Sequence, residues 1–230
     1  MRKGLADIKL VFLGALPILL GGFLGSLAAI TLFDYFGATG DALVRLTLGF
    51  IIGLIAITFI VGGASTEYPE HSEKSRLATR LKLRHMYWEE TLKRPVRYDV
   101  HNVKTAVFLL LFVGFTGGFF GLGGGWAAVP LLNLVMSIPI KVATGTSGVL
   151  LALGNAAAIW PYINVGALIG IIAAPWMLGQ VIGGLIGASL LTSLRASAVR
   201  ALLIVILFAS SVKLVARGIE TLTGIEIPVL

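Results

Sequence analysis

From Thr105 to Leu194 the chain carries one charged side chain, that of Lys141. A helix of ~20 apolar residues is enough to cross the ~30 Å hydrocarbon core of a bilayer, and this stretch is several times longer. The rest of the chain has the same bias, with 57% apolar and 13% charged residues. Soluble domains have about 45–50% and about 25%. This composition excludes a disordered chain, a nucleic-acid reader and an ordinary cytosolic enzyme.

The pattern predicts an all-α, polytopic integral membrane protein in four parts. Residues 1–66 form a partial first membrane repeat, 67–104 a cytoplasmic basic linker, 105–217 a complete second membrane repeat and 218–230 a tail. Spans are expected at residues 10–33, 46–66, 142–162, 166–194 and 198–217, of which the first four carry no charged residue. Arg2 and Lys3 also suit a cleaved signal peptide, but the length of the first apolar stretch and its Pro17 favour an integral span.

The linker, residues 67–104, carries much of the charge of the molecule. Half of the 18 basic residues lie between Lys74 and Lys104, and all three histidines fall in the linker. Such a basic loop is expected on the cytoplasmic side and does not indicate nucleic-acid binding. Residues 72–93 are predicted to form a helix on the anionic inner surface of the membrane. The absence of cysteine excludes disulfides and thiolate metal sites.

An internal repeat suggests the architecture. Three glycines of the first span recur in the fourth at a constant offset of 162, as GGFLGS and GGLIGA, and Arg45 recurs as Arg200. If the linker is cytoplasmic, residues 34–41 and the C-terminus lie outside, and the two copies start on opposite sides. This is the inverted repeat of many secondary transporters. An equivalent of residues 105–162 is expected before Arg2, so the sequence is either truncated or completed by a partner.

The most informative motif is the segment GLGGGWAAVP, residues 121–130. Its glycines and proline would interrupt a helix, so a helix to about Phe119, a glycine-rich turn and a second helical piece past Pro130 are expected. Irregular backbone within a membrane must be buried or line a cavity, and exposed N–H groups before a helix suit an anion. Helix packing is the alternative, because Gly117, Gly121 and Gly125 are spaced for close contact. A dinucleotide fingerprint is excluded, since no strand precedes the motif.

Two further polar groups follow. Thr144, Thr146 and Ser147 bring hydroxyls to the start of the next span, where they either cap the helix or donate to a bound oxyanion. Asn155 lies two turns further on and either contacts substrate or joins two helices. Lys141, in a short cytoplasmic loop, is expected to attract anions without binding them. The predicted substrate site comprises Gly121, Gly123, Gly124, Gly125, Trp126, Thr144, Thr146, Ser147 and Asn155.

These motifs resemble those of the TauE/SafE sulfite exporter family, also called DUF81 or toluene sulfonate uptake permeases. The resemblance rests on GFFGLGGGWAAVPLL, KVATGTS and INVGALIGIIAAPWMLGQVIGGLIGA, and it covers residues 105–217, with a weaker match over 2–63. It implies two repeated membrane halves and a substrate such as sulfite, a sulfonate or a related organic sulfur anion. This sequence departs from the pattern in lacking the first glycine hairpin.

The leading hypothesis is therefore a multi-pass transporter in the cell membrane of a prokaryote, with a small anion as substrate. No cofactor, metal or nucleic-acid partner is expected. Assembly into a homo-oligomer is compatible with the sequence. An intramembrane enzyme is disfavoured because residues 105–194 contain no Asp, Glu, His or Cys. For the same reason, anion binding in this half is expected to use neutral donors and to change little between about pH 6 and pH 8. A structural or partner-dependent membrane subunit is the alternative.

Overall fold

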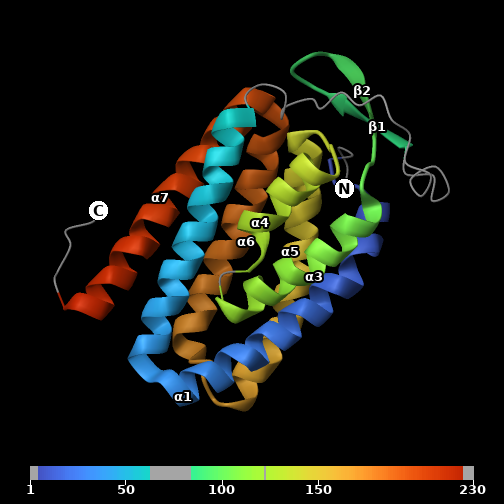
Figure 1. The fold of residues 1–230 in the computed structure, drawn as a ribbon. Coiled ribbons are helices and arrows are strands. Elements are labelled where there is room, and N and C mark those ends of the chain that lie inside the picture. The colour runs from blue at the N-terminus through green and yellow to red at the C-terminus, as the bar shows by residue number, and fades with distance from the viewer. Residues whose placement is uncertain (1–4, 63–83, 122, 225–230) are drawn as a thin grey trace.

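The computed structural model describes residues 5–62, 84–121 and 123–224, with the backbone alone at residues 33, 34, 37, 38, 41, 84 and 85. Its helices are α1 (Ile8–Gly62), α3 (Val103–Phe119), α4 (Gly125–Pro130), the π-helix η2 (Leu131–Val135), α5 (Ile140–Asn164), α6 (Gly170–Ser193) and α7 (Ala196–Thr223). In this described part, five helical segments are long and apolar enough to cross a membrane: Ile8–Leu32, Ala42–Gly62, α5, α6 and α7. The predicted all-α membrane fold is confirmed (Figure 1).

The first two spans are joined without a loop. α1 is helical throughout, including residues 34–41, for which a loop was predicted. Figure 1 shows α1 bending sharply, so that its two arms run in opposite directions. Gly37 and Gly40 fall in this region, where the lack of a Cβ lowers the cost of curving the backbone. The predicted loop is wrong because the reversal takes place within a helix.

The broken segment folds as predicted, into a re-entrant hairpin. α3 descends into the bundle, the chain turns at its glycines, and α4 with η2 returns toward the end from which α3 started (Figure 1). Two hydrogen bonds join the ends of this hairpin: His101 N–H donates to Met136 O at 3.1 Å, and Asn102 Nδ2 donates to Val135 O at 3.2 Å. The segment therefore enters and leaves on one side.

The two copies of the repeat run in opposite directions. Figure 1 shows the first arm of α1 and helix α6 crossing the bundle in opposite senses, and the second arm of α1 and helix α7 doing the same. This is the relation that the inverted repeat predicts. The second arm and α7 also pack together, and Ser211 Oγ donates to Gly49 O at 2.7 Å.

The glycines of the first copy are packing positions. A Cβ on Gly25 would meet the carbonyl oxygen of Phe115, and one on Gly21 would meet that of Leu111. Across the same interface, a Cβ on Gly118 would meet the carbonyl oxygen of Gly22. α1 and α3 are thus in backbone contact, which only residues without a side chain permit.

The matching glycines of α6 are different. No described atom lies within 4 Å of a Cβ built at any of its five glycines, and the most apolar window of α6 has no buried residue. Within the described residues, α6 contacts little besides α5. These open positions are Gly170, Gly179, Gly183, Gly184 and Gly187.

The linker contains strands instead of the predicted helix. β1 (Arg84–Glu89) and β2 (Arg94–Asp99) form an antiparallel hairpin, with Tyr87 opposite Val96. The rings of Tyr87 and Tyr98 meet edge to face at a centroid distance of 6.4 Å on its buried side. The helix prediction is wrong for residues 84–93, and residues 72–83 lie outside the described part of the chain.

Candidate functional site

The glycine turn is shaped by two residues in the left-handed region. Gly121 and Gly123 have φ values of +64° and +69°, which side chains rarely adopt. Gly123 N–H donates to Gly117 O at 3.2 Å and closes the turn. Tyr162, from the far end of α5, donates its hydroxyl to Gly118 O at 2.9 Å and fixes the end of α3. Nothing in the sequence pattern predicts this role of Tyr162.

The start of α4 offers free donors. Its hydrogen bonds begin with Ala127 and Ala128, whose N–H groups donate to Gly124 O at 3.1 and 2.8 Å. The N–H groups of Gly125 and Trp126 come before these and have no acceptor among the described residues, as is usual in the first turn of a helix. The Trp126 side chain adds Nε1, which is buried and has no hydrogen-bond partner in the described structure.

Asn155 is the polar side chain of α5 that faces this turn. A Cβ on Gly123 would lie 2.8 Å from Asn155 Oδ1 and 2.8 Å from the side chain of Leu151. The described structure gives the Asn155 amide no hydrogen-bond partner. The structure thus brings together five of the predicted site residues: Gly123, Gly124, Gly125, Trp126 and Asn155.

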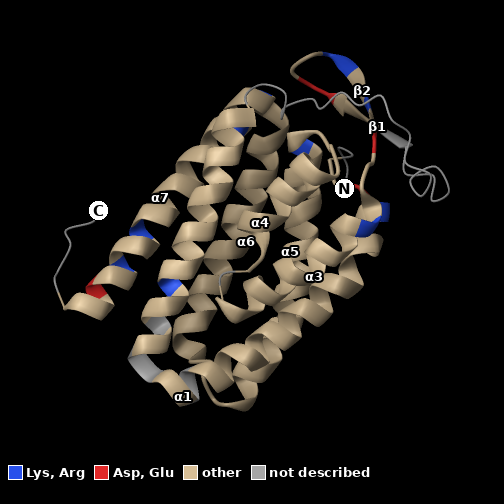
Figure 2. Cartoon of the chain, in the orientation of Figure 1, with Lys and Arg blue, Asp and Glu red and all other residues tan. Residues whose placement is uncertain are grey.

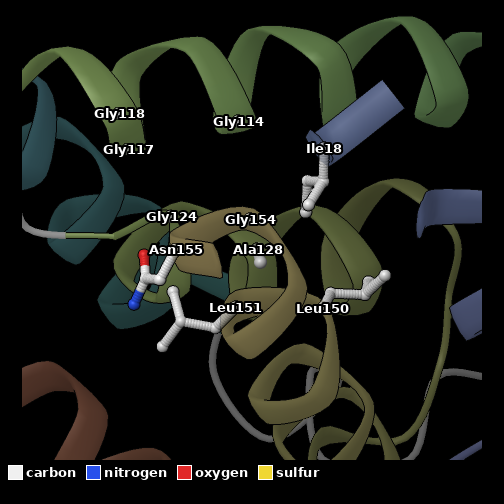
Figure 3. A pocket seen from close by; sticks show the side chains of 10 residues that line it. All are labelled: Ile18, Gly114, Gly117, Gly118, Gly124, Ala128, Leu150, Leu151, Gly154 and Asn155. Carbon is white, nitrogen blue, oxygen red and sulfur yellow. The ribbon is translucent and has the colours of Figure 1, made fainter. Parts of the chain in front are cut away.

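The space beside the turn is small. A cavity of about 10 Å³ lies between α1, α3, α4 and α5, and Figure 3 shows Asn155, Gly124 and Gly117 along it. That is room for about one water molecule. Its remaining lining is Ile18, Gly114, Gly118, Ala128, Leu150, Leu151 and Gly154. A substrate larger than water fits only if these walls move apart.

The predicted hydroxyl cluster lies elsewhere on α5. Thr144 Oγ1 donates to Ile140 O at 2.8 Å, and Ser147 Oγ donates to Thr144 O at 2.9 Å, so both bond to their own helix. Thr146 Oγ1 accepts from Asp7 N–H at 3.0 Å. Nine residues of helix, ~13 Å, separate Thr146 from Asn155. The expectation that these hydroxyls and the glycine turn form one site does not hold in this structure.

Gly121, on the outer side of the turn, is exposed.

Lys141 does not lie in an exposed loop. It falls in the first turn of α5, is 1% exposed, and donates from Nζ to Glu89 Oε1 at 2.6 Å. Glu89, from β1, is fully buried and also accepts from Tyr87 OH at 3.0 Å and from Thr91 Oγ1 at 2.7 Å. The expected role of Lys141 in attracting anions from solution is wrong here, because its charge is buried and paired.

A second buried contact joins the hairpin to α1. Asp7 caps α1, since its Oδ1 accepts from the N–H groups of Lys9 and Leu10 at 3.1 and 3.4 Å. Its Oδ2 accepts from Tyr98 OH at 2.9 Å. Burial, the charge of Asp7 and this hydrogen bond all raise the pKa of Tyr98, which therefore stays protonated and donating. The Glu89 carboxylate and the backbone N–H of Asp7 thus bond to α5 from outside the 105–194 segment, which itself contains no carboxylate.

The Lys141–Glu89 pair should be insensitive to pH near neutrality. Burial alone would raise the pKa of Glu89, but hydrogen bonds from Lys141, Thr91 and Tyr87 hold it below its ordinary value of 4.5. A carboxyl with a lowered pKa stabilises the fold above its unfolded-state pKa, and this contribution is lost as pH falls through the folded-state pKa. The stability difference between the parent and the E89Q/K141M double variant should therefore stay constant in the neutral range and shift toward the double variant as pH falls below 4.5. Thermal unfolding across pH measures this; a change between about pH 6 and pH 8 would contradict it.

The described residues contain no group of three or more His, Asp or Glu side chains that could hold a metal ion. The donors beside the glycine turn are neutral N–H and amide groups. Such groups can bind an anion by hydrogen bonds without a metal or a buried cation.

Comparisons with known proteins agree with this fold. The chain is similar to a probable membrane transporter protein, YunE, of Bacillus subtilis (strain 168), with 25% identity over 132 residues. These residues are 57% of this chain and 48% of that protein, so the match spans about half the length of the curated relative. No solved structure matches. The family described as Sulfite exporter TauE/SafE matches residues 1–214. The chain therefore belongs to the TauE/SafE sulfite exporter family and is a multi-pass membrane protein.

Proposed function

We propose that this protein transports a small oxyanion, such as sulfite or a sulfonate, and binds it at the glycine turn between α3 and α4. The family and the similarity to a probable membrane transporter support transport. The observation that carries the site is the group of donors without acceptors among the described residues beside one glycine turn: the N–H groups of Gly125 and Trp126 and the amide of Asn155. Trp126 Nε1 is a further buried donor without a partner in the described structure, and the Asn155 side chain is exposed.

Neutral donors suit this task. An anion moved from water into an apolar interior without hydrogen bonds costs many kcal/mol, so several converging donors are needed. A tetrahedral or pyramidal oxyanion has oxygens on several sides and can accept from the backbone and from α5 together. Neutral donors also hold the anion less tightly than a buried Lys or Arg, which favours release on the other side.

Transport would require the site to open. The cavity of about 10 Å³ is too small for an oxyanion, so we propose that α5 moves relative to the α3–α4 hairpin. Leu151, whose side chain lies against Gly123 and Gly125, is the residue of α5 that such a movement would displace first. Opening to one side and then the other around a fixed site is the mechanism associated with inverted repeats.

The proposal is tested by anion flux. The intact protein, reconstituted in liposomes, should move radiolabelled sulfite or methanesulfonate down a gradient at a rate at least tenfold above protein-free liposomes. Chloride, which lacks the oxygen acceptors, should move more slowly. Sulfite and methanesulfonate rates equal to the leak would contradict the proposal and favour the structural membrane subunit instead.

A further inference from the structure

The β1–β2 hairpin has two different faces. Along β1, Tyr87 and Glu89 are buried against the bundle, while Met86 and Trp88 are 65% and 57% exposed. Across the hairpin, Met86 lies opposite Arg97, which is also exposed. The exposed side thus combines a large aromatic ring, a flexible apolar chain and a guanidinium group.

The tip of the hairpin continues this pattern. Leu92 is 42% exposed, and Lys93 and Arg94 beside it are exposed as well. Among the described residues, no carboxylate pairs with Lys93, Arg94 or Arg97, whereas the acid of β1, Glu89, is turned inward to Lys141. Figure 2 shows basic residues on the hairpin and at the nearby start of α3. The exposed charged side chains of the hairpin from residue 86 to 99 are thus three basic ones and the acid Glu90, so their net charge is positive.

The hairpin is held in a fixed position relative to the ends of the helices. Its buried side is joined to α5 by the Glu89–Lys141 pair and to the cap of α1 by the Tyr98–Asp7 hydrogen bond. β2 ends at Asp99 and α3 begins at Val103, a distance of at most ~14 Å even for extended chain. The hairpin is therefore anchored at the start of α1, α3 and α5. The ends of membrane-crossing helices are expected at the depth of the lipid headgroups.

We propose that the outer side of this hairpin docks on anionic phospholipid headgroups. Tryptophan is favoured at the membrane interface, where its ring meets the hydrocarbon boundary. Unpaired Lys and Arg side chains next to a membrane are attracted to the negative surface of the cytoplasmic leaflet. The charge complementarity and the fixed depth both fit a lipid surface. The docking side is defined by Met86, Trp88, Leu92, Lys93, Arg94 and Arg97.

The chain contains no cysteine, so a single introduced one can be labelled uniquely. The intact protein with Met86→Cys, labelled with the environment-sensitive fluorophore NBD, is placed in nanodiscs of phosphatidylcholine with or without phosphatidylglycerol. Docking predicts a blue-shifted and at least twofold brighter emission when phosphatidylglycerol is present. Added salt should reverse this change, because salt screens exposed charges.

The matched control is the same labelled protein with Lys93, Arg94 and Arg97 all changed to Gln, which removes the charges and keeps Trp88. Its emission should be alike in the two lipid mixtures. The proposal is overturned if the parent's emission does not respond to phosphatidylglycerol or if the neutral variant responds as strongly. It is also overturned if the label becomes shielded only when cytosolic protein is added, which would indicate a protein partner instead.

Discussion

Replacing Gly25 with valine should prevent α1 and α3 from packing and destabilise the protein by ~3 kcal/mol or more. A Cβ at Gly25 would fall on the carbonyl oxygen of Phe115, which is backbone in the middle of α3 and cannot rotate away. Relief requires the two helices to separate, and the α3–α4 hairpin would then lose its support. Thermal unfolding in detergent and the fraction of monodisperse protein measure the effect.

The control is Gly148→Val, the same substitution on the exposed side of α5. No described atom lies within 4 Å of a Cβ at that position, so only the small difference in helix propensity is expected. If both variants unfold at the same temperature as the parent, the close approach of α1 and α3 is not what the structure indicates.

Replacing Glu89 with glutamine should release the hairpin from the bundle. The change keeps the shape of the side chain but leaves the Lys141 ammonium buried without a counter-charge, and breaking a buried pair in this way costs ~3–5 kcal/mol. Because the hairpin can detach without unfolding the helices, the loss should be local. Hydrogen exchange of residues 86–91 should become faster by at least tenfold, while α5 keeps its protection beyond the first turn.

The double variant E89Q/K141M removes both charges and should restore most of the protection. This separates the cost of an unpaired charge from the loss of an attractive pair. Equal exchange in the single and double variants would mean that the unpaired ammonium is not the cause.

The re-entrant hairpin was predictable because glycines and Pro130 are costly in a continuous helix. The position of the glycine turn along α5 could also have been predicted. From the glycine turn, α4 and η2 run back for ~16 Å to the end of the bundle at which α5 begins. A point ~16 Å along α5 from Ile140 is Leu151, which is one helical turn from Asn155. The hydroxyls at 144–147 were instead favoured because they start a helix, although the turn lies deeper than that start.

The hairpin and the ion pair were harder to predict. The buried side of the hairpin carries the charged Glu89 as well as Tyr87 and Tyr98, so apolar and polar residues do not alternate cleanly along β1. The sequence also offers several acids in the linker, and nothing in the spacing connects Glu89 with Lys141. Their pairing arises only when the hairpin folds back onto the start of α5.

The central claim is that the glycine turn and Asn155 bind the transported anion, and Asn155→Leu tests it most directly. Leucine is close in size to asparagine, and the Asn155 amide has no hydrogen-bond partner among the described residues, so the fold should be kept. A lost hydrogen bond to a charged ligand costs ~1.5–3 kcal/mol, which is a fall of roughly tenfold or more in affinity. Thr144→Val is the control, since the Thr144 hydroxyl bonds to its own helix. In liposomes at low sulfite concentration, the flux should fall at least tenfold in Asn155→Leu and less than twofold in Thr144→Val. Parental flux in Asn155→Leu, with the protein folded, would contradict the assignment of the site.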